Sequence, residues 1–185
     1  DIQDRLCAEI DNPEDLKQVS GMLKEVENRT VYMCFSADML HSGHIAIIRK
    51  AARLGCLIIG VLSDEAVISY KRYPLLPYAE RKALFENIRG VSRVVEQKTL
   101  SYKENLEKYH PDYVVHGDDW VSGFQKPVRQ EVLDTLKTYG GTLVEFPYSR
   151  DEKYKALENR ARADLSLPDM RRARLRKAIE MKGTV

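Results

Sequence analysis

The sequence has few cysteines, no long apolar run and little net charge, and each of these limits the class of protein. Its three cysteines, Cys7, Cys34 and Cys56, are odd in number and far apart, which implies neither a disulfide framework nor a Cys-x-x-Cys zinc site. No stretch approaches the roughly 18 to 20 consecutive apolar residues that span a bilayer. The first residues also lack the basic and apolar regions of a signal peptide. We therefore expect a cytoplasmic protein with no membrane partner. Because residue 1 is Asp rather than Met, we also expect the chain to be a piece of a longer protein.

The small net charge of +2 is unevenly distributed along the chain. Residues 150–185 hold 11 Lys and Arg against 6 Asp and Glu, so this tail is basic and the rest is slightly acidic. A basic tail can bind nucleic acid, but interleaved aromatic residues and known binding motifs are absent here. We interpret the tail as a solvated helix face and expect no nucleic-acid partner.

The two common phosphate-binding loops are also missing. The chain contains neither Gly-x-x-x-x-Gly-Lys-Ser/Thr nor Gly-x-Gly-x-x-Gly, which removes the main support for a P-loop or a dinucleotide site. It does contain His41-Ser42-Gly43-His44, between the apolar run Val31 to Phe35 and the helical pattern Ile45 to Leu54. Free amide N–H groups and the helix dipole favour an anion at such a helix start. This motif therefore predicts a phosphate site and nucleotide chemistry.

Three interpretations of the histidine pair remain open at this point. His41 and His44 could donate hydrogen bonds to oxygens that gain charge when phosphorus becomes five-coordinate. They could instead hold a metal, although no nearby Cys or His completes a zinc set. They could also simply cap the helix.

The hydrophobic pattern predicts an α/β, Rossmann-like fold: a parallel sheet with helices on both faces, plus N-terminal and C-terminal helical extensions. An amphipathic lead-in helix starts at Asn12-Pro13 and has apolar residues at helical spacing, at Leu16, Val19, Leu23 and Val26. Short runs that are apolar on both faces follow, at Val31 to Phe35, Leu57 to Leu62, Val94 and Val95, Tyr113 to Val115, and Leu143 to Phe146. The helical segments between them lie near Gly43 to Leu54, Asp64 to Tyr70, Ala79 to Asn87, Tyr102 to Tyr109, and Pro127 to Tyr139.

Two polar motifs follow two of these strands. Parallel sheets bind ligands beyond the carboxyl ends of their strands, where the strand order reverses. The histidine motif follows one strand and His116-Gly117-Asp118-Asp119-Trp120 follows another, so we expect one shared crevice. The predicted organisation is a lead-in over 1–30, a catalytic domain over 31–150 and a basic helical tail over 151–185.

The motifs in this order resemble the cytidylyltransferase type of nucleotidyltransferase, whose signature is a strand, a short acidic turn and His-x-Gly-His. Here that stretch reads Phe35-Ser36-Ala37-Asp38-Met39-Leu40-His41-Ser42-Gly43-His44. The likeness continues through Gly60 to Glu65, Lys71, Tyr78 to Arg81, and Gly117 to Trp120. Five ordered matches within about 31–150 are far more specific than any one of them.

The resemblance implies a role for each matched residue. His41 and His44 would stabilise the transition state at the α-phosphorus, and Lys71 would bind the triphosphate or the acceptor anion. The nucleotide would lie against Phe35, Ser36, Ala37, Asp38, Gly43, Arg81, His116, Gly117, Asp118 and Trp120. The acceptor would contact Tyr73, Asp64 and Arg160. Read without the family, Lys71 is a surface charge, Gly117-Asp118-Asp119 is a turn and Trp120 is a core anchor.

One stretch departs from the family pattern. A second signature, Gly-Ile-Ser-Ser/Thr-Thr, usually follows the last strand and binds phosphates through hydroxyls and amides. The corresponding residues here are Ser149-Arg150-Asp151-Glu152-Lys153-Tyr154-Lys155, in which charged groups largely replace hydroxyls. Arg160 lies where the family often has an arginine.

Four stretches carry a finer likeness: Ser36-Ala37-Asp38, Asp64-Glu65-Ala66, Ser69 to Leu76 and Val114 to Trp120. Within the family, they most resemble the domains of phosphonate biosynthesis. Some of these are fused ahead of a phosphoenolpyruvate mutase, as in the fosfomycin pathway, and the tail from Leu167 resembles the lead into such a domain. The resemblance implies that CTP and a small phosphonate, first 2-hydroxyethylphosphonate, are the substrates, with Mg²⁺ as cofactor and Asp38 as its nearest carboxylate. 2-Aminoethylphosphonate, phosphocholine and glycerol 3-phosphate are the alternative acceptors, and a homodimer is expected. A non-catalytic nucleotide-binding module is the alternative from another class.

Overall fold

The computed structural model describes residues 12–36, 39–70 and 74–147, and then residues 154, 156, 157, 159 and 160. The chain divides into two compact units, Asp1–Tyr148 and Ser149–Val185. The described residues of the second unit are helical. No helix in the described part of the chain is both long and apolar enough to cross a membrane.

The first helix, α2 (Pro13–Asn28), begins as its sequence predicts. The side chain of Asn12 accepts hydrogen bonds from the backbone N–H groups of Glu14 and Asp15, at 2.9 and 3.0 Å. Pro13 occupies the first turn, where its missing N–H costs no hydrogen bond. The predicted lead-in helix is therefore confirmed, and it leads directly into the first strand.

Strands and helices alternate through the rest of the first unit. The strands are β1 (Thr30–Phe35), β2 (Cys56–Leu62), β3 (Val91–Gln97), β4 (Tyr113–Gly117) and β5 (Thr142–Phe146). The helices are α3 (Ser42–Ala51), α4 (Asp64–Tyr70), α5 (Tyr78–Glu86), α6 (Lys103–Tyr109) and α7 (Lys126–Tyr139). Two short 3₁₀ helices, η1 (Asp118–Trp120) and η2 (Gly123–Gln125), follow β4.

All five strands lie in one parallel sheet with the order β3-β2-β1-β4-β5. From β1 the chain proceeds to β2 and β3 on one side, and then crosses back to place β4 and β5 on the other side. The strand order therefore reverses between β1 and β4. Ligands of open α/β sheets bind at this point, outside the carboxyl ends of the strands.

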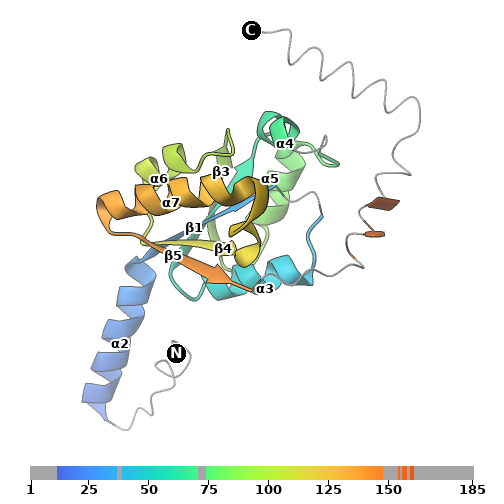
Figure 1. Cartoon of the computed structure of the whole chain (residues 1–185). Coiled ribbons are helices and arrows are strands. Elements are labelled where there is room, and N and C mark those ends of the chain that lie inside the picture. The colour runs from blue at the N-terminus through green and yellow to red at the C-terminus, as the bar shows by residue number, and fades with distance from the viewer. Residues whose placement is uncertain are drawn as a thin grey trace. The chain divides into compact units, whose positions relative to one another are not determined.

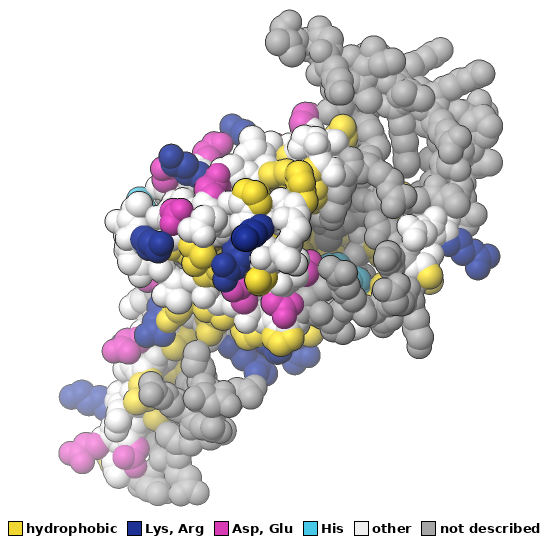
Figure 2. Space-filling model, viewed as in Figure 1, with side chains coloured by type: hydrophobic (Ala, Val, Ile, Leu, Met, Phe, Trp, Pro, Cys, Tyr) yellow, Lys and Arg dark blue, Asp and Glu magenta, His cyan; other side chains and the backbone are white. Residues whose placement is uncertain are grey.

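Helices cover both faces of the sheet (Figure 1). One core cluster joins alternate residues of β1, β2 and β4 to α3 and α5, through Ile48, Ala51 and Phe85. The other joins the opposite faces of the same strands to α6 and α7, through Leu106, Val132 and Leu136. The predicted α/β, Rossmann-like architecture is confirmed. Figure 2 shows acidic and basic side chains interspersed over the face in view, as on a solvated helical layer.

The structure lengthens the predicted strands by one or two residues, and β3 by more. The prediction for β3 covered only Val94 and Val95, whereas the strand runs from Val91 to Gln97. β3 lies at the edge of the sheet, so Ser92, Arg93 and Glu96 stay exposed within it. An apolar run therefore marks only the middle of this strand.

Candidate functional site

The two motifs singled out in the sequence lie at the carboxyl ends of β1 and β4. These strands are neighbours, with Val31 paired to Tyr113 and Tyr32 to Val114. β1 ends at Phe35 and leads to the start of α3, while β4 ends at Gly117 and continues into η1. The sheet order thus places both motifs at the point where the strand order reverses.

His41 and His44 are held by the first turn of α3. His41 is the N-cap residue, and its Nδ1 accepts a 3.1 Å hydrogen bond from the Gly43 N–H. The His41 backbone N–H in turn lies 3.4 Å from Nδ1 of His44, which completes a reciprocal capping box. The centroids of the His41 and His44 rings are 3.9 Å apart, so the two imidazoles are in contact.

This capping geometry selects one tautomer for both rings. A ring nitrogen that accepts a backbone N–H carries no proton, so in the neutral imidazoles the proton is on Nε2. Each ring is then a donor at Nε2. Capping, one of the interpretations of the pair, is what the structure shows locally. The cap engages Nδ1 of each ring, and Nε2 is the ring nitrogen that carries the proton.

Phe35 fixes the orientation of His44 from the last position of β1. The edge of one ring meets the face of the other, with centroids 5.7 Å apart and an interplanar angle of 81°. Phe35 also packs on Phe85 of α5, with centroids 5.0 Å apart. Phe35 thus supports the histidine pair from the core.

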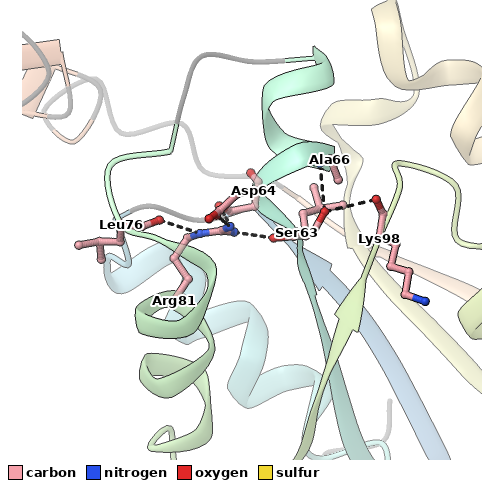
Figure 3. Close-up of polar contacts among 8 residues, drawn as sticks. Ser63, Asp64, Ala66, Leu76, Arg81 and Lys98 are labelled. Carbon is pink, nitrogen blue, oxygen red and sulfur yellow. Dashed lines mark hydrogen bonds and ion pairs between the residues drawn. The ribbon is translucent and has the colours of Figure 1, made fainter. Parts of the chain in front are cut away.

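Arg81 of α5 binds four chain segments around the same strand ends (Figure 3). Its Nε donates to the Leu76 carbonyl at 3.0 Å, and its Nη1 donates to the carbonyls of Leu62 at 2.8 Å and Ser36 at 3.3 Å. Its Nη2 forms an ion pair with Oδ1 of Asp64 at 2.6 Å. The side chain of Arg81 is 0% exposed. The guanidinium therefore ties together the ends of β1 and β2, the start of α4 and the segment before α5.

The contacts of Arg81 assign it a positioning role. As placed, the buried guanidinium presents no surface to a nucleotide, and its charge is balanced by Asp64. Direct contact of Arg81 with the nucleotide, or of Asp64 with the acceptor, stays a prediction. Ser63 lies beside this group and caps α4, accepting from the Ala66 N–H at 3.1 Å (Figure 3). The sequence signal for that cap was a serine directly before Asp64.

The end of β4 presents a second histidine environment. His116 stacks face to face on Trp120, with centroids 3.7 Å apart and planes 8° apart. Its Nδ1 lies 2.8 Å from the Gly117 carbonyl, which can only accept, so Nδ1 carries the proton. Burial lowers the pKa of His116, although the Gly117 carbonyl and Asp119 oppose the shift. His116 is therefore favoured as a neutral ring.

Trp120 forms a hydrogen bond with Glu145, whose ion pair with Arg129 was not predicted from the sequence. Its Nε1 donates to Oε1 of Glu145 at 2.6 Å. Arg129 donates twice to the same carboxylate, from Nε at 2.8 Å and from Nη2 at 2.7 Å. These bonds, those from Arg129 first, hold the pKa of Glu145 below its ordinary value. The one sequence signal for this ion pair was Glu145, the single acidic residue in the apolar run Leu143 to Phe146.

Trp120 itself belongs to the core. Its side chain is only 1% exposed and packs with Tyr102 on the α6 and α7 side of the sheet. As placed, the ring offers no exposed surface to a nucleotide, and its packing supports the core-anchor interpretation. Asp118, two residues earlier, is exposed at the start of η1.

Several predicted site residues lie outside the described residues. These are Ala37, Asp38, Lys71 and Tyr73. Of the stretch Ser149 to Lys155, which replaces the second family signature, only Tyr154 is described. Arg160 is exposed and belongs to the second unit. Within the described part of the chain, no group of three His, Cys, Asp or Glu residues could hold a metal ion.

Comparison with known proteins gives a family and several relatives of this chain. Residues 33–162 match the family described as Cytidylyltransferase-like. Over 89 residues the chain is 36% identical to glycerol-3-phosphate cytidylyltransferase of Staphylococcus aureus, covering 47% of this chain and 67% of that protein. Over 95 residues it is 37% identical to ethanolamine-phosphate cytidylyltransferase of Arabidopsis thaliana, covering 48% of this chain but only 23% of that protein.

A solved structure shares the fold. The lipopolysaccharide core biosynthesis protein from Thermoplasma volcanium GSS1 superposes with a TM-score of 0.55 at 22% identity. The superposition covers 66% of this chain and 98% of that one.

Proposed function

The chain belongs to the cytidylyltransferase-like family, and from that premise we propose that it transfers CMP from CTP to a small phosphonate and releases pyrophosphate. Family membership supports the class of enzyme, a nucleotidyltransferase. The relatives named for glycerol 3-phosphate and ethanolamine phosphate support a small phosphorylated acceptor. The phosphonate itself rests on the sequence resemblance to domains of phosphonate biosynthesis.

The observation that carries the proposal is the histidine pair at the start of α3. Both rings accept backbone N–H groups at Nδ1 and therefore carry a donor at Nε2. They lie at a helix N-terminus, which attracts anions, and at the reversal of strand order. Two donors held in this way suit the oxygens of an α-phosphorus that gains charge during substitution.

The proposed reaction is a direct in-line displacement. An oxygen of the acceptor phosphonate attacks the α-phosphorus of CTP and forms a new P–O–P bond. The bond from the α-phosphorus to the β-phosphate oxygen breaks, and pyrophosphate leaves with that electron pair. The attacking oxygen is already deprotonated near neutral pH, so the chain needs no general base. His41 and His44 contribute positioning and hydrogen bonds, which strengthen as the charge develops.

Mg²⁺ belongs to this proposal as the ion that accompanies the triphosphate. Its chemistry would be charge neutralisation across the phosphate oxygens. Asp38 is the carboxylate proposed to contact it, and Lys71 the cation proposed to bind the triphosphate or the acceptor. Both residues lie outside the described part of the chain. Among the described residues, no group of three His, Cys, Asp or Glu could hold a metal ion.

The first choice of acceptor is 2-hydroxyethylphosphonate. The alternatives are 2-aminoethylphosphonate, phosphocholine and glycerol 3-phosphate, to which the comparisons add ethanolamine phosphate. An acceptor with an ammonium group would require a carboxylate or aromatic cage, whereas a hydroxyl requires only a hydrogen-bonding partner. Cytoplasmic location, homodimer formation and fusion to a phosphoenolpyruvate mutase also stay predictions.

Pyrophosphate release tests the proposal directly. CTP, ATP, GTP and UTP would each be combined with Mg²⁺ and with each of the five acceptors. Release confined to CTP and 2-hydroxyethylphosphonate supports the proposal in full, and release with CTP and another acceptor corrects the substrate. Binding of CTP without release from any pair would favour a non-catalytic nucleotide-binding module, the alternative suggested by the altered stretch Ser149 to Lys155.

A further inference from the structure

The turn that follows β4 is anchored by a charged pair that the proposed mechanism does not use. Glu145 on β5 and Arg129 on α7 are far from the histidine motif in sequence. Glu145 accepts a hydrogen bond from Trp120, the residue that ends η1, and Arg129 in turn binds Glu145. We propose that Glu145 and Arg129 are positioning residues for the nucleotide site, because they hold Trp120 and thereby fix His116 and the turn that carries Asp118. This inference rests on the proposed function, since it takes the turn that carries the exposed Asp118 to contact CTP.

The ring of Trp120 is held on three sides. One face stacks on His116 at 3.7 Å, its Nε1 donates to Glu145 at 2.6 Å, and Tyr102 packs at a centroid distance of 5.8 Å. An indole restrained in this way keeps a single orientation. His116 stacks against it and donates from Nδ1 to the Gly117 carbonyl at 2.8 Å. The backbone at the start of the turn is therefore tied, through His116, to the position of Trp120.

Arg129 is needed because Glu145 is not fully enclosed. The side chain of Glu145 is 21% exposed and that of Arg129 is 27% exposed. A lone carboxylate with that much exposure could rotate into water. The two parallel bonds from Arg129 set the plane of the carboxylate and direct Oε1 to Trp120. Arg129 also favours the ionised form of Glu145, whose pKa is lowered chiefly by these bonds.

The chain offers a direct spectroscopic probe of this arrangement. Trp120 is its only tryptophan, so all intrinsic tryptophan fluorescence comes from the ring that Glu145 holds. A change in the stacking of His116 or in the hydrogen bond at Nε1 changes that emission. We therefore expect CTP binding to alter the fluorescence of the unmodified chain.

The experiment measures CTP affinity by calorimetry, together with steady-state kinetics, fluorescence and thermal unfolding. We expect Glu145→Ala to raise the Kd and KM for CTP about tenfold, as for loss of one charged hydrogen bond, while kcat at saturating CTP changes less than about twofold. Arg129→Ala should act in the same direction but less strongly. Glu145→Gln should recover part of the affinity, because its amide oxygen still accepts from Trp120. Glu145→Gln is also the variant to test if Glu145→Ala does not fold.

Two further variants separate positioning from general stability. Lys137→Ala removes an exposed ion pair with Asp134 on the same helix and should leave CTP affinity unchanged. Trp120→Phe removes the indole N–H but keeps an aromatic ring. Adding Glu145→Ala to it should then raise the Kd little further. If the effects of the two substitutions on the Kd for CTP are fully additive, Glu145 does not act through its hydrogen bond to Trp120.

Other outcomes decide the inference clearly. Variants of Glu145 and Arg129 that lower the melting temperature but leave the Kd and KM for CTP unchanged would overturn it, because the pair would then be merely structural. If the unmodified chain binds CTP but releases no pyrophosphate, the transfer reaction is overturned while the Kd values still decide the positioning role. If it binds no CTP, both proposals fail.

Discussion

Replacement of His44 by alanine tests the core of the proposed mechanism. The substitution removes one of the two Nε2 donors at the start of α3. Loss of a single positioned donor to a developing oxyanion costs about 2.7–4 kcal/mol of transition-state stabilisation, which lowers kcat by a factor of about 10² to 10³. We expect a decrease in kcat of this size for His44→Ala.

The structure also sets the expected cost in stability. The cap bond from the His41 N–H to His44 is 3.4 Å long, near the limit for a hydrogen bond, so its loss should cost near the lower end of about 0.5–2 kcal/mol. The edge contact with Phe35 adds about 0.5–1.5 kcal/mol. A domain stabilised by about 5–15 kcal/mol stays folded after such losses. The decrease in kcat should therefore greatly exceed any loss of folded protein.

The assay is pyrophosphate release at saturating CTP and acceptor, with urea unfolding of the same preparations. His110→Asn provides a matched control. His110 ends α6 in the left-handed backbone conformation at φ 41°, which Asn tolerates, so kcat should be unchanged. A folded His44→Ala protein with near-normal kcat would show that Nε2 of His44 does not stabilise the transition state.

Three further predictions concern stability. Arg81→Met should lower the free energy of unfolding by about 3–5 kcal/mol, because it removes a fully buried guanidinium and leaves a partly buried carboxylate and three carbonyls without their donor; a loss below about 1 kcal/mol in urea unfolding would contradict this. Gly60→Ala should cost about 1–3 kcal/mol, because an added Cβ would overlap the Tyr32 hydroxyl; thermal unfolding at or above the original midpoint would show that the strand has room. The third concerns pH. Because the folded state lowers the pKa of His116 below its ordinary value of 6.5, the contribution of this residue is present above that value and is lost as the pH falls through the folded pKa. His116→Phe, which keeps a flat ring on Trp120, should therefore lose less stability than the unmodified chain between pH 8 and pH 5. Parallel loss of stability in both proteins would exclude His116 as the source.

Most of the fold could be predicted because its signals are local. Asn12 and Pro13 marked the start of α2 through contacts within three residues, and runs that are apolar on both faces marked the buried strands. β3 was predicted too short because an edge strand buries fewer residues, so polar side chains interrupt its pattern. The capping role of His41 was also local, since its bonds span two and three residues.

Local patterns along the chain were therefore enough to predict the elements, the sheet type, the family resemblance and the two motifs. Which strands are neighbours, and hence that both motifs lie where the strand order reverses, became clear only from the packed structure. It also decided the partners of the charged residues. Arg81 reaches Ser36 across 45 positions, and Trp120 reaches Glu145 across 25. The physical reason is that periodicity and caps act within one or two helical turns, whereas these hydrogen bonds form only after separate elements have packed against one another.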